Sequence, residues 1–343
     1  MALNSPAAGP AGAVRDRGMG ALLGLAVGDA MGMPTQGMRR RDILADYGPI
    51  TGLRAAGPRQ RIASGLPAGT VTDDTEQAML LADLLLQGGG QIDPLMFASA
   101  LTDWERAMEA KGSLDLLGPS TREAVRRIAA GTPPAEAGRG GATNGAAMRI
   151  TPVGLARRPD PLPDLVDAVV EASIVTHNTS IGLAAAAAVA AAVSVGIEGG
   201  SRADSTALAI EAANLAASRG HWVPGGQIGP RIGWATAHLA QVPPAAWADE
   251  IDAVIGTGVA AQESVVAAFA IFAVAPSAWE AVCLAASVGG DTDTIGAIAG
   301  AMAGAAEGTG AWPTGVVQQV EQVNAIDFGP AVTELLRLRS ARQ

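Results

Sequence analysis

Cysteine, lysine and aromatic residues are scarce in this sequence. Of its 343 residues, one is cysteine and 3% are aromatic. The single thiol, Cys283, excludes an internal disulfide, and its apolar neighbours Val282 and Leu284 predict a buried, inert group. One lysine, Lys111, stands among 23 basic residues, and the net charge is −10. Because a polyphosphate backbone is bound by clustered basic residues, we expect no nucleic-acid partner.

Long apolar runs are also rare, which limits membrane and export interpretations. Residues 1–12 lack the basic start and apolar core of an export signal, so we expect a disordered N-terminal tail there and a cytoplasmic protein. The segment 181–197 is barely long enough to span a membrane and consists mainly of alanine. We predict that it forms a tightly packed core helix instead, and we expect no membrane partner.

The residues that are abundant indicate a globular, helical protein. Hydrophobic residues make up 49% of the chain and charged residues 16%, which is too apolar for disorder. Apolar residues recur at helical spacing, whereas alternating runs rich in Val, Ile and aromatics are nearly absent. We therefore predict an all-α fold, a compact single-domain multi-helix bundle over residues 13–343, with more than roughly ten helices.

Proline and glycine predict where several helices begin and end. Proline suits the first helical position, which places helix starts at Asp93-Pro94 and Gly118-Pro119. Glycine runs place helix ends at Gly88-Gly89-Gly90 and Gly199-Gly200.

Two segments interrupt the helical pattern. Residues 48–69 contain glycine, proline and arginine and predict a long surface loop that could cover a site. Residues 138–145 are too rich in glycine for a regular helix. They form either a plain connector or a loop whose backbone amides approach a ligand.

Two acidic clusters carry the chemistry. Each places closely spaced aspartates and threonines just before an apolar helical run: Thr72-Asp73-Asp74 and Asp291-Thr292-Asp293-Thr294. One such cluster alone would cap a helix, but the duplication favours metal binding. Adjacent aspartates repel one another, and a bound cation removes that cost. Carboxylate and hydroxyl oxygens suit hard ions, so the sequence predicts two divalent cations, Mg²⁺ or Mn²⁺.

Four sequence blocks together resemble the signature of the ADP-ribosylglycohydrolase family, in the family's order. The blocks are Gly28-Asp29-Ala30-Met31-Gly32-Met33-Pro34, Thr72-Asp73-Asp74-Thr75, Asn144-Gly145-Ala146-Ala147-Met148-Arg149 and Gly289-Gly290-Asp291-Thr292-Asp293-Thr294. The resemblance implies an all-helical fold with a two-metal cleft. It also implies hydrolysis of a glycosidic bond to the ribose of ADP-ribose.

The resemblance assigns roles to particular residues. It implies that Thr292 faces away from the metals and that the ligands are Thr72, Asp73, Asp74, Asp291, Asp293 and Thr294. It implies substrate binding by Asn144, Gly145 and Arg149, and also by His177, which lies in a further block, Val175-Thr176-His177-Asn178. A lone histidine between helices is equally often a hydrogen-bonded core residue, so both roles stay open for His177. Thr143 stands where the family usually has a glycine, which would tighten the loop.

One departure from the family pattern concerns catalysis. Many relatives have a glutamate where this chain has Gln36, and glutamine cannot accept a proton. Catalysis would then rest on a metal-activated water assisted by Asp73 or Asp74, with Gln36 orienting water or substrate. The expected substrate is an ADP-ribosylated protein or a small ribosyl metabolite. The alternatives are an N-ribosyl hydrolase acting on a nucleoside-like molecule and a catalytically silent ADP-ribose-binding protein.

Overall fold

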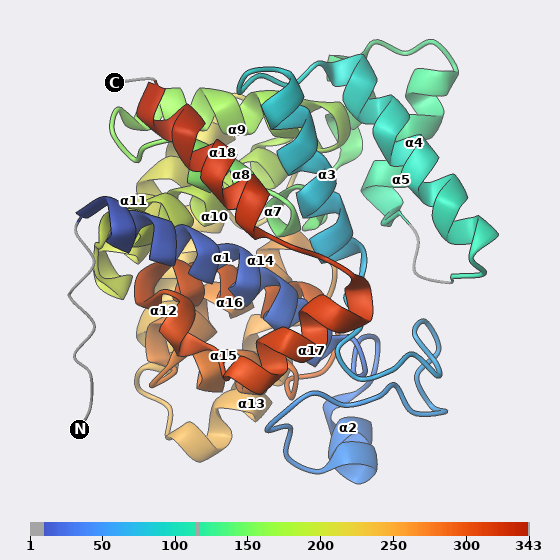
Figure 1. The fold of residues 1–343 in the computed structure, drawn as a ribbon, viewed down its shortest axis with the longest axis vertical. Helices are drawn as coiled ribbons and strands as arrows, with labels where there is room; N and C mark the ends of the chain where they lie inside the picture. The colour runs from blue at the N-terminus through green and yellow to red at the C-terminus, as the bar shows by residue number, and fades with distance from the viewer. Residues whose placement is uncertain (1–9, 114–116, 342–343) are drawn as a thin grey trace.

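The computed structural model describes residues 10–113 and 117–341, and this part of the chain is a bundle of helices (Figure 1). It contains 18 α-helices and three isolated β-bridges but no β-strand, which confirms the all-α prediction. The first nine helices are α1 Pro10–Gly32, α2 Arg40–Tyr47, α3 Asp73–Gln87, α4 Pro94–Ala110, α5 Pro119–Ala129, α6 Pro134–Ala137, α7 Gly145–Met148, α8 Thr151–Ala156 and α9 Leu162–His177. The others are α10 Ser180–Glu198, α11 Arg202–Ala217, α12 Ile228–Leu239, α13 Trp247–Glu250, α14 Ala261–Val274, α15 Ala278–Ala285, α16 Thr292–Glu307, α17 Thr314–Asn324 and α18 Gly329–Ala341.

Proline and glycine mark the helix boundaries as predicted. Helices α4 and α5 begin at Pro94 and Pro119, and the Asp93 side chain accepts hydrogen bonds from two backbone amides of the first turn of α4. Helix α3 ends just before Gly88, and α10 ends just before Gly199, whose φ of 92° suits glycine. The N-terminus differs from the prediction, because α1 already begins at Pro10, inside the segment expected as a tail. Residues 1–9 lie outside the described residues.

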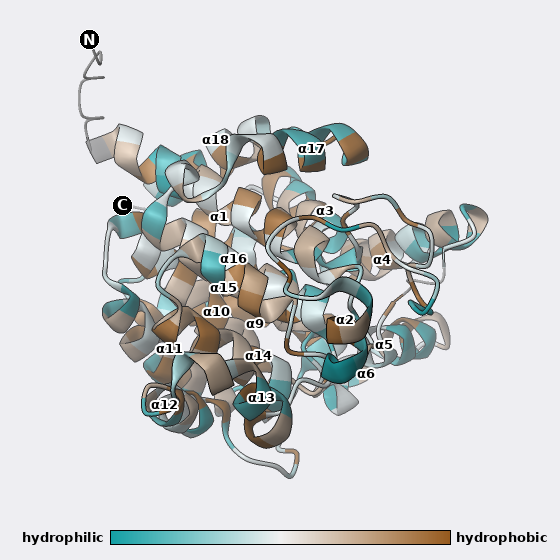
Figure 2. Ribbon diagram, turned by 90° about the horizontal axis from the view of Figure 1, so that it is seen from below, coloured by the Kyte–Doolittle hydropathy of each residue, from teal (hydrophilic) through white to brown (hydrophobic). Residues whose placement is uncertain are grey.

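The alanine-rich segment is a core helix, as predicted. Among the described residues, α10 is the one helix long and apolar enough to cross a membrane, and its most apolar window is 94% buried inside the protein. Figure 2 shows apolar ribbon concentrated in the middle of the molecule, around α10, α14 and α15. One connected cluster of buried apolar side chains extends from Ala21 to Leu335. The chain therefore folds around a single main core, as the one-domain prediction requires.

Helices α1 and α16 pack backbone to backbone through glycines at four-residue intervals (Figure 1). A Cβ atom on Gly24 would lie closer than 3.0 Å to the carbonyl of Gly300, and one on Gly28 would meet the carbonyl of Gly296 in the same way. The absence of side chains allows the two helices to approach this closely. The contact brings the C-terminal end of α1 beside the first turn of α16, which carries the second acidic cluster.

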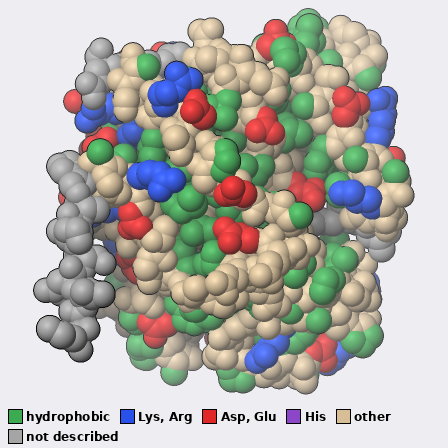
Figure 3. All heavy atoms as spheres, in the orientation of Figure 1, with side chains coloured by type: hydrophobic (Ala, Val, Ile, Leu, Met, Phe, Trp, Pro, Cys, Tyr) green, Lys and Arg blue, Asp and Glu red, His purple; other side chains and the backbone are tan. Residues whose placement is uncertain are grey.

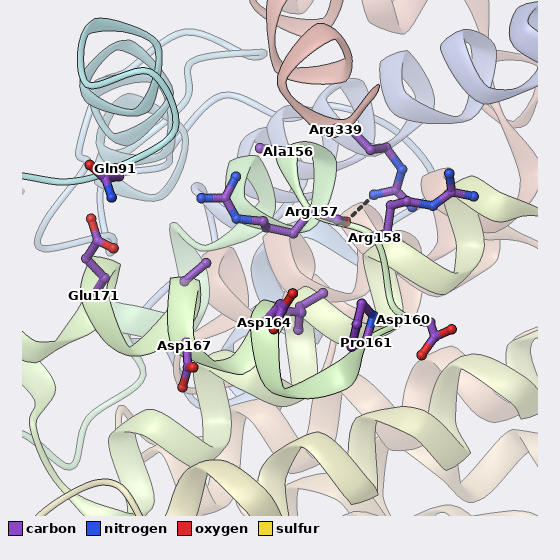
Figure 4. A pocket seen from close by; sticks show the side chains of 12 residues that line it. Gln91, Ala156, Arg157, Arg158, Asp160, Pro161, Asp164, Asp167, Glu171 and Arg339 are labelled. Atoms are coloured by element: carbon purple, nitrogen blue, oxygen red, sulfur yellow. Dashed lines mark hydrogen bonds between the residues drawn. The ribbon is translucent and has the colours of Figure 1, made fainter. Parts of the chain in front are cut away.

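The C-terminal helix is fastened to the core by a buried arginine. Arg339 of α18 is 4% exposed and donates hydrogen bonds to the carbonyls of Gly154, Arg157 and Ser194 and to the Glu198 carboxylate. Figure 4 shows Arg339 reaching the Arg157 carbonyl at the edge of a cavity of about 250 Å³. A buried guanidinium needs such partners, and here it fixes α18 against α8 and α10.

Two expectations from composition can be compared with the structure. Cys283 is only partly buried, so the expectation of a buried thiol was too strong. Its desolvation and nearby Glu280 raise its pKa to about 12, so the thiol stays protonated and unreactive. On the face seen in Figure 3, basic side chains are scattered among acidic ones and form no continuous basic patch.

Candidate active site

The two acidic clusters lie at the N-termini of α3 and α16. Thr72 and Asp291 occupy the N-cap positions of these helices, but neither side chain makes a capping hydrogen bond. The capping interpretation, which either cluster alone would have allowed, therefore does not account for these residues. Thr292 hydrogen-bonds the Thr35 hydroxyl at 2.9 Å and the Gly32 carbonyl at 3.0 Å, and so faces α1, as the family resemblance implied.

Both clusters contribute to one cavity of about 210 Å³. Several predicted site residues line it: Gln36, Asp73, Asn144, Gly145, Asp291, Asp293 and Thr294. The sequence prediction missed other lining residues, among them Ile62, Arg122 and Val259. Ile62 belongs to the 48–69 loop, so this loop does border the site, as expected.

Thr72 and Asp74 are buried beneath the cavity lining. The Asp74 Oδ2 atom accepts hydrogen bonds from the Thr294 hydroxyl at 3.2 Å and from the Thr72 hydroxyl at 3.3 Å, which joins the two clusters. The other oxygen, Oδ1, is buried and has no hydrogen-bond partner. An unsatisfied buried carboxylate oxygen is costly, so it marks a position where a ligand would be stabilised.

Burial and the neighbouring carboxylates raise the pKa of Asp74. The pKa of Asp74 lies well above its usual value because of burial and then because of the charges of Asp293, Asp73, Asp29 and Asp291. The structure therefore holds more negative charge in one place than its own cations neutralise.

The carboxylates of the two clusters could provide only some of the ligands that a divalent cation needs. Among the described residues, no three His, Cys, Asp or Glu side chains are arranged to hold one ion by themselves. The nearby threonine hydroxyls of Thr72 and Thr294, or water, would have to complete the coordination. All these donors are oxygens, as Mg²⁺ and Mn²⁺ prefer.

Asp29 of α1 is a site residue whose role the sequence interpretation missed. It is fully buried, and its carboxylate accepts hydrogen bonds from the backbone amide of Thr72 at 2.9 Å and from that of Thr75 at 3.1 Å, as well as from both hydroxyls. Burial raises its pKa to about 6, although these bonds oppose the shift. Asp29 thus fixes the start of α3 against α1. A single carboxylate within the apolar run from Ala21 to Met33 was the available signal.

Arg149 does not line the cavity, which corrects its predicted role as a substrate ligand. It is fully buried, with its guanidinium 5.1 Å from the centre of the Phe97 ring. It donates to the Gln77 side-chain oxygen at 2.9 Å, and the Gln77 amide donates to Asp73 at 2.9 Å. Arg149 therefore orients Asp73 through Gln77 and contributes positive charge beneath the carboxylates.

His177 is also buried behind the cavity and not exposed to substrate. Its Nδ1 atom lies 2.8 Å from the Thr176 hydroxyl, which accepts from Arg149, and its Nε2 atom lies 2.9 Å from the Thr143 hydroxyl. Burial, together with the charge of Arg149, holds the pKa of His177 well below its usual value, so the ring is neutral. Of its two open roles, the hydrogen-bonded core residue is the one found. It positions Thr143, which lines the cavity.

The glycine-rich segment 138–145 does more than connect two helices. Gly141 packs against the Thr176 backbone so closely that a Cβ atom would clash. The next residues then reach the cavity, where the Asn144 side chain donates to Asp291 at 2.5 Å and to the Ser264 hydroxyl at 2.9 Å. Asn144 therefore holds a carboxylate of the second cluster, and Gly145 lines the cavity beside it, where a Cβ atom would lie 3.0 Å from the His177 ring.

The backbone of Gln36 is held from two sides. Its backbone carbonyl accepts a hydrogen bond from the Gln60 side chain of the 48–69 loop at 2.9 Å, and its backbone N–H donates to the Gly32 carbonyl at the end of α1. The side chain is 5% exposed and lines the cavity, and its Nε2 atom has no partner. This nitrogen is an unpartnered donor in a side chain that lines the cavity.

An all-helical fold with paired aspartate–threonine clusters facing one cavity defines the class of protein. The family model for ADP-ribosylglycohydrolase matches residues 10–342. The chain therefore belongs to the ADP-ribosylglycohydrolase family, a family of hydrolases of ADP-ribosyl linkages.

Individual relatives agree with this assignment. The chain is 33% identical over 96% of its length to the uncharacterised protein YegU of Escherichia coli, of which it covers 98%. It is 34% identical to the ADP-ribosyl-[dinitrogen reductase] glycohydrolase of Rhodospirillum rubrum over 50% of this chain and 55% of that one. A solved structure, described as an ADP-ribosylglycohydrolase-related protein complex, superposes with a TM-score of 0.67 at 29% identity, covering 95% of this chain and 98% of the other.

Proposed function

We propose that this protein is a divalent-metal-dependent glycohydrolase that cleaves the bond between the ribose of ADP-ribose and an attached group. The observation that carries the proposal is the convergence of both clusters on one cavity, with an unpartnered Asp74 oxygen buried beneath it. In the absence of cations, this concentration of carboxylates would only destabilise the fold.

The residues that would hold the cations are the six ligands that the family resemblance implied. Asp73, Asp293 and Asp291 supply charge at the cavity surface, and Asp74 supplies it from beneath, with the hydroxyls of Thr72 and Thr294 beside it. When bound, such ions supply Lewis acidity toward ribose hydroxyls and water.

The chain's own side chains orient the reacting groups. Asn144 holds Asp291, the Arg149–Gln77 pair holds Asp73, and His177 holds Thr143. Gln36 offers an amide donor to substrate or water but cannot take a proton. Proton acceptance therefore falls to Asp73 or Asp74, whose positions are fixed by α3.

The names of two relatives support a substrate class. One is named an ADP-ribosyl-[dinitrogen reductase] glycohydrolase. Another, Tri1 of Pseudomonas putida, is named an ADP-ribosylarginine hydrolase and is 34% identical over 48% of this chain. We therefore propose an ADP-ribosylated protein, modified on arginine, as the substrate. A catalytically silent ADP-ribose-binding protein is the alternative, and the amide of Gln36 is the observation that favours it.

Hydrolysis of ADP-ribosyl-arginine with and without chelator tests the proposal. We expect release of ADP-ribose in Mn²⁺ or Mg²⁺, loss of activity in EDTA, and recovery with either ion but not with Zn²⁺, because the proposed ligands are all oxygens. Far-ultraviolet circular dichroism should be unchanged by EDTA, since the helices are held by a separate apolar core. Full activity of the metal-stripped protein would contradict metal dependence, and binding of ADP-ribose without turnover would favour the silent alternative.

Gln36→Glu is expected to lower activity, not to restore a missing base. A glutamate would add another negative charge to a cavity already lined by Asp73, Asp291 and Asp293, and it would remove the amide donor. Loss of one such hydrogen bond corresponds to about a tenfold fall in kcat/KM. Gln36→Ala is the control, because it removes the amide without adding charge. A gain of the ~10²–10⁴-fold typical of general-base assistance would show that glutamine weakens the enzyme.

A further inference from the structure

Within the part of the chain that the structure describes, one basic residue lines the catalytic cavity. This is Arg122, in the first turn of α5, and the acidic residues that line the same cavity are Asp73, Asp291 and Asp293. The other nearby guanidinium, that of Arg149, is fully buried and already bonded to Gln77 and Thr176. Arg122 is thus the cation that a ligand in the cavity can reach.

The present partner of Arg122 does not prevent it from binding a ligand. Its Nε atom lies 3.2 Å from Glu105 of α4, and the Arg122 side chain is 54% exposed. An ion pair with this much solvent exposure contributes little to stability. Turning the guanidinium toward a ligand therefore costs little.

The cavity lining carries charge of both signs. The aspartates of both clusters favour cations and repel anions, and among the described residues Arg122 is the one positively charged side chain in the same lining. The guanidinium is planar with several N–H donors, which matches phosphate oxygens in paired contacts. A ligand that carries both ribose hydroxyls and phosphate groups can therefore interact with both kinds of charge in this lining.

We propose that Arg122 binds the diphosphate of the substrate and thereby selects ADP-ribosyl compounds over ribosyl compounds that lack phosphate. This inference rests on the proposed function and specifies how that site recognises its substrate. It also gives direction to binding: the ribose faces the aspartates while the diphosphate lies beside α5. The sequence shows no motif around Arg122, so only its place in the cavity identifies it.

The test compares Arg122→Gln with Arg126→Gln, which removes an arginine one turn further along α5. Arg126 pairs with Glu123 at 2.7 Å and does not line the cavity, so it is a matched control. We expect Arg122→Gln to raise KM for ADP-ribosyl-arginine about 10- to 100-fold with little change in kcat, the effect of losing a charged hydrogen bond. Its preference for ADP-ribosyl-arginine over ribosyl-arginine, as a ratio of kcat/KM, should fall by the same factor. Arg122→Lys should recover part of the loss.

Calorimetric binding of ADP-ribose separates this inference from the proposed function. Wild type and Arg126→Gln should bind equally, and Arg122→Gln should bind about 10- to 100-fold more weakly. If Arg122→Gln binds ADP-ribose as tightly as Arg126→Gln does, the diphosphate contact is wrong even if hydrolysis is confirmed. If wild type cleaves no ADP-ribosyl compound but loses ADP-ribose affinity on Arg122→Gln, the contact stands and the proposed hydrolysis is wrong.

Discussion

Asp293→Asn is expected to weaken Mn²⁺ binding by about 100-fold or more and to abolish hydrolysis at ordinary Mn²⁺ concentrations. Asp293 is 2% exposed, lines the cavity, and is the carboxylate whose charge most strongly raises the pKa of Asp74. Its removal takes away one anionic ligand. It also relieves repulsion, so the metal-free variant should be at least as stable to urea as metal-free wild type.

Isothermal titration calorimetry and urea unfolding measure these two effects separately. Asp83→Asn is the control, because Asp83 is exposed on α3 and lies outside the cavity lining. Unchanged Mn²⁺ affinity in Asp293→Asn would remove the second cluster from the metal site. A large loss of stability in the metal-free variant would instead give Asp293 a structural role.

Gly24→Ala is expected to destabilise the protein by about 3 kcal/mol, although alanine favours helices elsewhere. The added methyl group would overlap the Gly300 carbonyl and the Trp312 ring on the facing side of the helix pair. Backbone atoms cannot rotate away as side chains can, so α1 and α16 must separate. The midpoint of urea unfolding should fall, and activity should fall with it, because both acidic clusters are positioned by this contact.

Gly315→Ala provides the matched control. Gly315 is also helical, in α17, but a Cβ atom there would meet nothing within 4 Å. The substitution should be neutral or stabilise by up to about 1 kcal/mol. Equal behaviour of the two alanine variants would show that α1 and α16 are not as tightly packed as the structure indicates.

Local features of the fold could be predicted from the sequence because their causes are local. Proline at Pro94 and Pro119 and glycine at Gly88 and Gly199 act through their own backbone preferences. The alanine-rich segment 181–197 predicted a core helix because small apolar side chains allow neighbouring helices to pack closely. The glycines spaced by four in α1 and α16 are also visible in the sequence. Their spacing does not predict, however, that these two helices pack against each other.

The candidate site also contains residues that the sequence could identify and residues whose roles depend on contacts between distant segments. The two clusters were recognisable because paired aspartates and threonines are unusual before apolar helices, and the structure brings both to one cavity. The role of Arg149 was misjudged and that of His177 stayed open, because the burial of both side chains depends on packing that links α4, α7 and α9. Arg122 and Asp29 were missed because their roles arise from contacts between distant segments, such as that of Asp29 with Thr72.

The pairing of α1 with α16 has a consequence for how the protein is made. During synthesis α1 leaves the ribosome first, whereas its partner emerges near the end, on the order of tens of seconds later at usual elongation rates. Until then the glycine face of α1 lacks its partner helix. Asp29 can already accept its hydrogen bond from Thr72, but the cavity still lacks the residues of the second acidic cluster. We therefore expect the carboxylate cluster to assemble late and productive folding to be largely post-translational. We would expect chains stopped before Thr292 to depend on chaperones and to be degraded readily.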